Sequence, residues 1–260
     1  MPSDTLNITL LQSDIVWEDK QANFAQYEAQ LTSIKERKEV VVLPEMFTTG
    51  FSMQPERFAE AMDGETIEWM RRMAATYRCI ITGSVMIKEE ERYYNRLVWM
   101  QPNGQYYHYD KRHLFAFANE DQHYSAGEKK LILQVNGWRI CPVICYDLRF
   151  PVWLRNQEEA YDILIVVANW PARRAYAWRS LLVARAIENM SYVVGVNRVG
   201  NDGKEIYHNG NSAVINPLGE VLWEHTDEVA TKTITLDKSL LTATRAQFPF
   251  LKDADTFYIQ

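Results

Sequence analysis

The chain has 260 residues, 47% hydrophobic and 24% charged, which is the composition of an ordinary folded protein rather than a disordered one. The formal net charge is −6 and the basic residues are scattered, so the basic stripe of a nucleic-acid-binding protein is missing. No apolar run approaches the ~18 residues of a membrane-spanning helix, so the expected partner is a small molecule, not a nucleic acid or a membrane.

The first half of the chain alternates short apolar segments with segments of helical spacing. Residues 6–12 are typical of a strand, and residues 19–37 place Phe24, Tyr27 and Leu31 on one helical stripe. Further along, strands are predicted at 39–43, 79–87, 93–101 and 105–110, with a helix at 65–77 and a hairpin turn at 102–104.

The second half begins with residues 112–130, which have no clear period and are predicted to form a long loop of the kind that is usually functional. Strands are then predicted at 131–135, 138–144, 162–168, 192–198, 211–216, 220–224 and 230–236, with helices at about 150–160 and 174–191. Hairpins among alternating strands and helices indicate an α/β fold, a four-layer α-β-β-α sandwich of two mixed sheets with helices outside. No linker is visible, so residues 1–260 are expected to form a single domain.

The cysteines bear on the cellular compartment. There are three, Cys79, Cys141 and Cys145, and the N-terminal segment has no basic region followed by a long apolar stretch. An odd count without a secretory signal argues against a disulfide framework. The sequence therefore predicts a cytoplasmic protein, in which a free thiol persists.

Three reactive side chains each follow a predicted strand: Glu45, Lys111 and Cys145. A cysteine at a strand-to-helix turn is exposed for attack, and the N–H of Tyr146 beside it can stabilise an oxyanion. Alone, each has an ordinary alternative: a buried structural cysteine, a capping glutamate or a solvated lysine. Together they supply the nucleophile, base and oxyanion stabiliser that acyl transfer requires.

Competing motifs are missing from the sequence. The histidines have no metal-ligand spacing, and neither a phosphate-binding loop, a dinucleotide fingerprint nor a Gly-x-Ser-x-Gly elbow is present. Another possibility is a papain-like pairing of the cysteine with His113 or His208, although the cysteine lies late in the chain for that fold.

The segments around the three residues resemble the nitrilase, or carbon–nitrogen hydrolase, superfamily. They are VVLPEMFTTGF around Glu45, YDKRHLF around Lys111, VICYDLRFP around Cys145, and GNSAVINPLGEVL at 210–222. The segments CYDLRFP, VANWP and RAIENMSYVVGVNRVG are most similar to the ω-amidase branch. The alternatives are an aliphatic amidase, a nitrilase, an N-carbamoylase or a catalytically silent binding protein on the same scaffold.

The resemblance implies the α-β-β-α fold, a Glu45–Lys111–Cys145 triad, no metal or organic cofactor, and a homodimer whose helices pack across the interface. It also implies a second glutamate near the lysine, for which the candidates are Glu120 and the adjacent Asp121. For an ω-amidase the substrate is the amide of a 2-oxo dicarboxylic acid.

Such a substrate has a distal carboxylate that needs a cation or N–H donors. The candidates are Arg149, Arg173 and Arg198. An ion pair within the protein is the ordinary alternative for Arg149. Four aromatic residues are candidate pocket walls, with core packing as the alternative for each: Phe115, Phe117, Tyr124 and Trp170.

Overall fold

The computed structural model describes residues 3–259, and its strands form two β-sheets. The first sheet contains β1 (Thr5–Gln12), β2 (Val40–Val42), β3 (Ile80–Glu89), β4 (Arg92–Met100), β5 (Tyr106–Asp110) and β13 (Ala230–Asp237). Their order is β13-β1-β2-β3-β4-β5. Strand β2 is parallel to both β1 and β3, and the other pairs are antiparallel, so the sheet is mixed.

The second sheet is also mixed, with parallel strands at its centre. It contains β6 (Leu133–Val135), β7 (Trp138–Ile144), β8 (Ile163–Ala168), β9 (Tyr192–Asn197), β10 (Val199–Asn201), β11 (Tyr207–Ile215) and β12 (Val221–Thr226). Strands β7, β8 and β9 are parallel neighbours, and β6, β10, β11 and β12 add antiparallel pairs. The carboxyl ends of β7 and β8 therefore lie side by side at one edge of the sheet.

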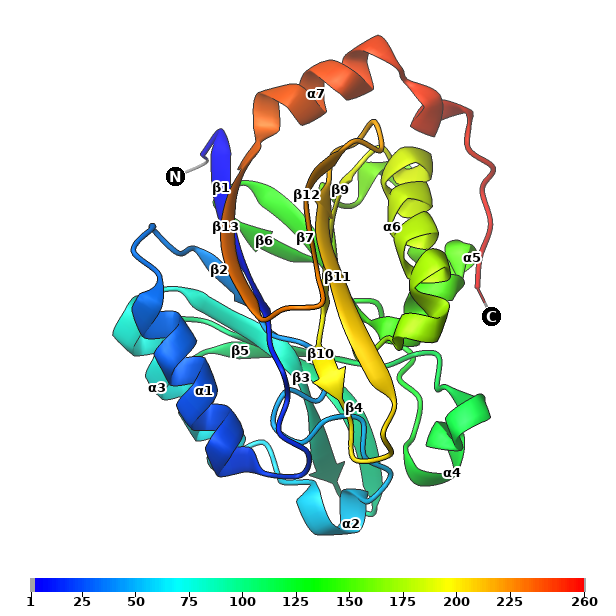
Figure 1. Cartoon of the computed structure of the whole chain (residues 1–260). Coiled ribbons are helices and arrows are strands. Elements are labelled where there is room, and N and C mark those ends of the chain that lie inside the picture. Colours follow the sequence, from blue (N-terminus) through cyan, green and yellow to red (C-terminus); the bar gives the residue numbers. More distant parts are fainter. Residues whose placement is uncertain (1–2, 260) are drawn as a thin grey trace.

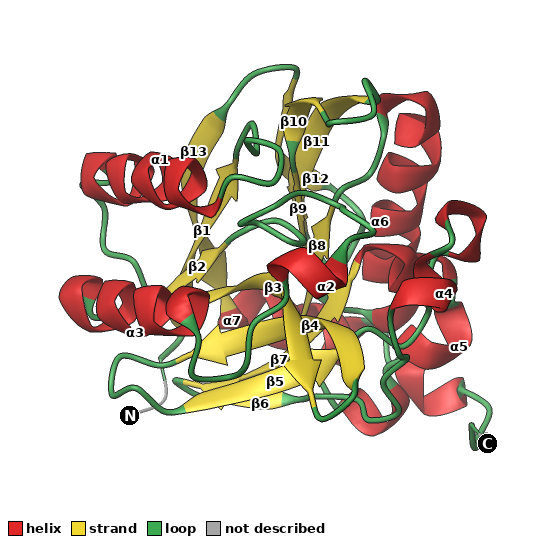
Figure 2. Ribbon diagram, turned by 90° about the horizontal axis from the view of Figure 1, so that it is seen from below, coloured by secondary structure: helices red, strands yellow, loops and turns green. Residues whose placement is uncertain are grey.

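Helices cover the outer face of each sheet (Figures 1 and 2). Helices α1 (Lys20–Ser33) and α3 (Glu65–Tyr77) lie over the first sheet, where Phe24 and Trp69 stack with their ring centroids 5.1 Å apart. Helix α6 (Ala175–Asn189) lies over the second sheet and buries Trp178 and Leu182. The order of layers is α-β-β-α, which confirms the predicted fold class.

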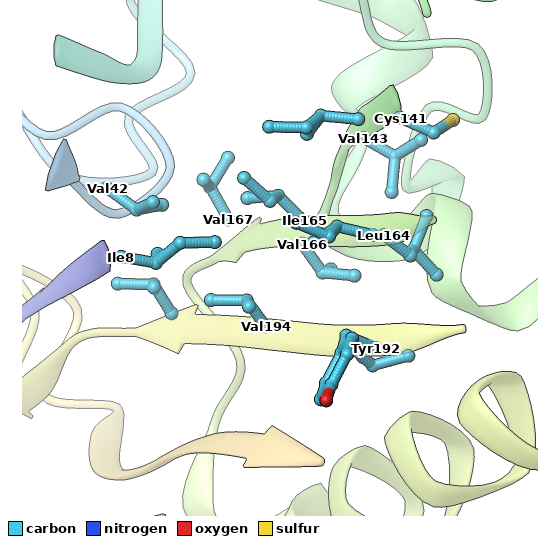
Figure 3. Packing of buried hydrophobic residues seen from close by; sticks show 14 of the residues in the cluster. Ile8, Val42, Cys141, Val143, Leu164, Ile165, Val166, Val167, Tyr192 and Val194 are labelled. Atoms are coloured by element: carbon cyan, nitrogen blue, oxygen red, sulfur yellow. The ribbon is translucent and has the colours of Figure 1, made fainter. Parts of the chain in front are cut away.

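The inner faces of the two sheets share one hydrophobic core. Ile8 and Val42 of the first sheet face Ile165, Val167 and Val194 of the second (Figure 3), and all five are fully buried. Branched side chains pack well on a pleated surface, so the sheets hold each other in a fixed orientation. Residues at the strand ends of both sheets are thereby held in fixed relative positions.

The predicted helix at about 150–160 is wrong. The structure has two short pieces there, α5 (Pro151–Leu154) and a 3₁₀ turn Gln157–Glu159, and a separate 3₁₀ turn Cys145–Arg149 precedes them. The Asn156 side chain hydrogen-bonds both the N–H and the C=O of Tyr161, and Glu158 has φ of +53°. An asparagine that bonds the backbone in this way competes with helical hydrogen bonds.

Four further elements were not predicted: α2 (Pro55–Phe58), α4 (Glu120–His123), β10 and α7 (Lys238–Gln247), of which α4 lies within the predicted loop 112–130. Helix α7 buries Leu241 and Thr244, and its Lys238 and Arg245 form ion pairs with the buried Asp162. Among residues 3–259, no helix combines the length and the hydropathy needed to cross a bilayer.

Candidate active site

Glu45, Lys111 and Cys145 lie together where strand ends of the two sheets meet. Glu45 follows β2, Lys111 follows β5 directly, and Cys145 follows β7 directly. All three line one cavity of about 200 Å³. The structure therefore brings together the three residues that the sequence suggests as a set.

Lys111 is the centre of the buried charges. Its Nζ lies 2.8 Å from Glu45 Oε1 and 2.8 Å from Glu120 Oε2, and none of the three side chains is exposed. Burial alone would lower the pKa of Lys111, but the carboxyl groups of Glu120 and Glu45 outweigh it and raise this pKa well above its ordinary value. These contacts therefore favour the ammonium form of Lys111.

Glu120 is the second glutamate beside the lysine, and Asp121 is not part of the site. Glu120 begins the short helix α4 (Glu120–His123), and its Oε2 also accepts a hydrogen bond of 2.6 Å from the N–H of Phe115. Burial raises the pKa of the Glu120 carboxyl, and Lys111 opposes this effect. Asp121 is exposed to solvent.

Cys145 has a strained backbone, with φ of +43° at the first residue of its 3₁₀ turn. A non-glycine residue in this region is costly and is often found at functional sites. Burial and then the Glu45 carboxylate raise the pKa of the Cys145 thiol well above its ordinary value, while Lys111 and the N–H of Asn169 oppose this. The resting thiol is therefore protonated at neutral pH and needs a base before it can attack.

Two asparagines that the sequence analysis did not single out hold Glu45 in place. Asn95 on β4 donates from Nδ2 to Glu45 Oε1 at 2.8 Å and to Glu120 Oε1 at 3.1 Å. Asn169, just beyond β8, donates its N–H to Glu45 Oε2 at 2.8 Å. Asn169 lies in the VANWP segment, so the family resemblance could have indicated it, but Asn95 lies within an ordinary-looking strand.

The predicted substrate-binding residues divide into those at the cavity and those elsewhere. Tyr146, Arg149, Arg173, Phe115, Phe117 and Trp170 line the cavity. Arg198 is buried elsewhere, bonded to Asp14 and to backbone carbonyls, so the structure does not support it as a substrate ligand. Tyr124 is also buried away from the cavity and donates to the carbonyl of Ser52. Arg174 lines the cavity and was not predicted.

The two histidines considered for a cysteine–histidine pair have other partners. His113 Nδ1 lies 2.8 Å from Asp147 Oδ1, and His208 Nδ1 lies 2.9 Å from the carbonyl of Ile206. The groups that act on the Cys145 thiol are Glu45, Lys111 and Asn169. In the part of the chain that the structure describes, His, Cys, Asp and Glu side chains form no cluster that could hold a metal ion.

Comparison with known proteins agrees with this arrangement. The carbon–nitrogen hydrolase family model matches residues 7–246. The chain is 46% identical to Omega-amidase YafV of Escherichia coli (strain K12) over 253 residues, which is 97% of this chain and 98% of that protein. It is 31% identical to 2-oxoglutaramate amidase of Bacillus subtilis (strain 168) over 250 residues, 95% of this chain and 96% of that protein.

Solved structures give the same result. XC1258 from Xanthomonas campestris, a CN-hydrolase superfamily protein with an arsenic adduct in its active site, superposes with a TM-score of 0.97 at 43% identity, covering 99% of this chain and 100% of that one. Saccharomyces cerevisiae Nit3, of the nitrilase superfamily, has the same fold, with a TM-score of 0.86 at 22% identity and coverage of 95% and 96%. The chain therefore belongs to the carbon–nitrogen hydrolase family and is a hydrolase of carbon–nitrogen bonds.

Proposed function

We propose that the chain is an ω-amidase, which hydrolyses the terminal amide of α-ketoglutaramate or α-ketosuccinamate to a 2-oxo dicarboxylate and ammonia. Its similarity to the Escherichia coli Omega-amidase and the Bacillus subtilis 2-oxoglutaramate amidase supports this proposal. The buried Glu45 and Lys111 and the partly exposed Cys145 provide the base, the cation and the thiol that the reaction needs.

The observation that carries the choice of substrate is a cluster of three arginines in the cavity wall. Arg149, Arg173 and Arg174 form no salt bridge with a carboxylate among residues 3–259, although Asp202 also lines the cavity. Two of the arginines make cation–π contacts. The Arg149 guanidinium lies 4.8 Å from the Trp170 ring centroid, and that of Arg174 lies 5.0 Å from the Phe115 ring centroid. Burial and then Arg173 lower the pKa of Arg174. A substrate carboxylate would relieve this crowding of positive charge.

In the first half of the proposed reaction, Glu45 takes the proton from the Cys145 thiol and the sulfur attacks the amide carbon. The carbonyl oxygen becomes an oxyanion, which the Lys111 ammonium and the N–H of Tyr146 stabilise. Glu45 then returns the proton to the amide nitrogen, because ammonia leaves only once its nitrogen is protonated. The carbon–nitrogen bond breaks and a thioester remains on Cys145.

In the second half, a water molecule occupies the place that ammonia has left. Glu45 takes its proton as the oxygen attacks the thioester carbon, and Lys111 again stabilises the oxyanion. The carbon–sulfur bond breaks, the proton returns to the sulfur, and the acid leaves. The fixed contacts of Asn95 and Asn169 hold the Glu45 carboxylate in one orientation through both halves.

Ammonia release tests this proposal. The purified protein should release ammonia rapidly from α-ketoglutaramate and only slowly from glutamine, a simple nitrile or an N-carbamoyl amino acid. Release from another of these compounds alone would keep the proposed catalytic groups and replace the substrate. No release from any of them would favour a silent scaffold.

Removing a cavity arginine should weaken binding of the keto-amide selectively. We expect Arg149→Gln and Arg174→Gln each to raise KM for α-ketoglutaramate about 10- to 100-fold, since a hydrogen bond to a charged group contributes about 1.5–3 kcal/mol. Hydrolysis of an uncharged aliphatic amide should not change. Arg72→Gln is the matched control, because Arg72 pairs with Glu28 on the outer helices. Equal losses on both substrates would contradict a role in binding the carboxylate.

We also propose that the enzyme is a cytoplasmic homodimer. Exposed apolar side chains gather on α6, on β12 and in the turn before β12: Tyr176, Ile187, Leu218, Val221 and Leu222. Exposed apolar patches commonly mark interfaces, and a second copy covering this face agrees with the expected packing of helices across a dimer. Sedimentation equilibrium would decide, because a monomer at micromolar concentration contradicts the dimer.

The free state of Cys79, Cys141 and Cys145 is compatible with a reducing compartment.

A further inference from the structure

The carboxylate of Asp147 lies behind the cavity and accepts four hydrogen bonds, although its side chain is fully buried. Oδ2 accepts from the Tyr109 hydroxyl at 2.8 Å and from the N–H of Ile144 at 3.1 Å. Oδ1 accepts from the N–H of His113 at 3.0 Å and from its Nδ1 at 2.8 Å. We propose that Asp147 is a positioning residue that sets the separation between Lys111 and Cys145 without touching the substrate.

The four donors come from the segments that carry Lys111 and Cys145. Tyr109 precedes Lys111 by two residues and His113 follows it by two. Both sides of the lysine segment therefore donate hydrogen bonds to the Asp147 carboxylate. Ile144 directly precedes Cys145, so the turn that carries the thiol is fastened to it as well. Lys111 belongs to a segment at the end of the first sheet and Cys145 to one at the end of the second. Asp147 is thus a direct connection between the two segments.

The cost of burying this carboxylate supports a specific role. Among the described residues no lysine or arginine pairs with Asp147, and its one potentially cationic partner is His113. Burying an ionised carboxylate is expensive unless its oxygens are well hydrogen-bonded. A neutral side chain could fill the same space at lower cost, but no neutral side chain of this size has two oxygens that each accept a backbone N–H.

His113 joins the lysine segment to the cysteine turn a second time. Its ring stacks on Phe150, the residue that ends the turn, with centroids 3.7 Å apart and planes inclined by 5°. The hydrogen bond to Asp147 and the stacking on Phe150 are separate contacts of one side chain. Substitutions can therefore remove one and keep the other.

Asp147→Asn disrupts the hydrogen bonds that connect the two segments, with little change in the shape of the side chain. Each carboxylate oxygen accepts one backbone N–H, whereas an amide has a single accepting oxygen. The new NH₂ group must therefore face the N–H of Ile144 or that of His113, whichever way the side chain turns. We expect kcat for the keto-amide to fall about 10- to 100-fold with KM changed less than about threefold, because small misplacements of reacting groups have effects of this size.

A second measurement needs no amide substrate. Lys111 lowers the pKa of the Cys145 thiol, so a lysine that relaxes away from the sulfur should shift the pH profile of Cys145 alkylation by iodoacetamide to higher pH. The inference rests on the proposed catalytic roles of Cys145 and Lys111, but the alkylation profile does not depend on which substrate is hydrolysed. The parent could release no ammonia from the keto-amide while Asp147→Asn still shifts the pH profile of Cys145 alkylation. That result would reject the ω-amidase proposal and keep this inference.

Two substitutions of His113 separate positioning from packing, and they remain informative if Asp147→Asn does not fold. His113→Asn keeps an N–H donor for Asp147 and loses the stacked ring, whereas His113→Phe keeps the ring and loses the donor. We expect His113→Phe to lose kcat and to shift the alkylation profile, and His113→Asn to remain within about threefold of the parent. The reverse order, or an Asp147→Asn variant with parental kcat and profile, would overturn the proposal.

Discussion

The Cys145→Ala variant should release no measurable ammonia from α-ketoglutaramate, a loss of at least about 10⁴-fold, because removing a covalent nucleophile leaves only the residual catalysis of binding and oxyanion stabilisation. Its unfolding temperature should stay close to that of the parent. The thiol is partly exposed to the cavity, so its loss opens no void in the packed core. Ammonia release and thermal unfolding of the two proteins, measured together, test both statements.

Cys141→Ala is the matched control, on the strand β7 that ends just before Cys145. Cys141 is fully buried in the hydrophobic core (Figure 3), and burial raises the pKa of its thiol to about 12. We expect this variant to keep the parental kcat and to lose about 1 kcal/mol of stability from the shortened side chain. Activity retained in Cys145→Ala, or lost in Cys141→Ala, would contradict the assignment of the nucleophile.

The parts of the site that could be predicted are those encoded locally. Glu45 and Cys145 each follow a run of apolar residues typical of a buried strand, Lys111 follows a predicted strand rich in tyrosine, and strand ends commonly carry the sites of α/β proteins. The hairpins among those strands also indicate two mixed sheets. The three residues were each ambiguous alone, and their occurrence as a set within family-like segments made the prediction specific.

The parts that could not be predicted depend on contacts between distant segments. Asn95 supports Glu45 only because the segment that follows β2 comes within hydrogen-bonding distance of β4, and nothing in the surrounding residues indicates this. Arg198 was a reasonable candidate for a substrate ligand, but its guanidinium donates hydrogen bonds to Asp14 and to nearby backbone carbonyls. Arg149 is similar in sequence terms, yet it stacks on Trp170 at the cavity.

The fold and the proposed chemistry are related through charge. One buried ammonium faces two buried carboxyl groups, and the neighbouring thiol is held protonated. Such a cluster is stable only if every member is hydrogen-bonded, and Asn95, Asn169 and the N–H of Phe115 complete its contacts. The same rigid contacts that stabilise the charges leave Glu45 next to the sulfur, where a base is required.

Glu45→Gln should have opposite effects on turnover and on thiol reactivity. Turnover should fall at least about 10³-fold, because the general base that also protonates the leaving ammonia is lost. The Glu45 carboxylate raises the pKa of the Cys145 thiol, so a neutral amide should lower this pKa. Alkylation of Cys145 by iodoacetamide at neutral pH should then become faster than in the parent. Initial rates of ammonia release and alkylation profiles over pH measure the two effects.

The opposite signs distinguish lost chemistry from lost structure. A variant with a distorted site would lose turnover and would also lose the influence of Lys111, which lowers the thiol pKa, so its alkylation would become slower. Glu120→Gln is the comparison, since Glu120 contacts Lys111 and is not among the main groups that act on the thiol. We expect it to reduce turnover less than Glu45→Gln and to leave alkylation near the parental rate. Slower alkylation in Glu45→Gln would show that Glu45 acts mainly by holding Lys111 in place rather than as the base.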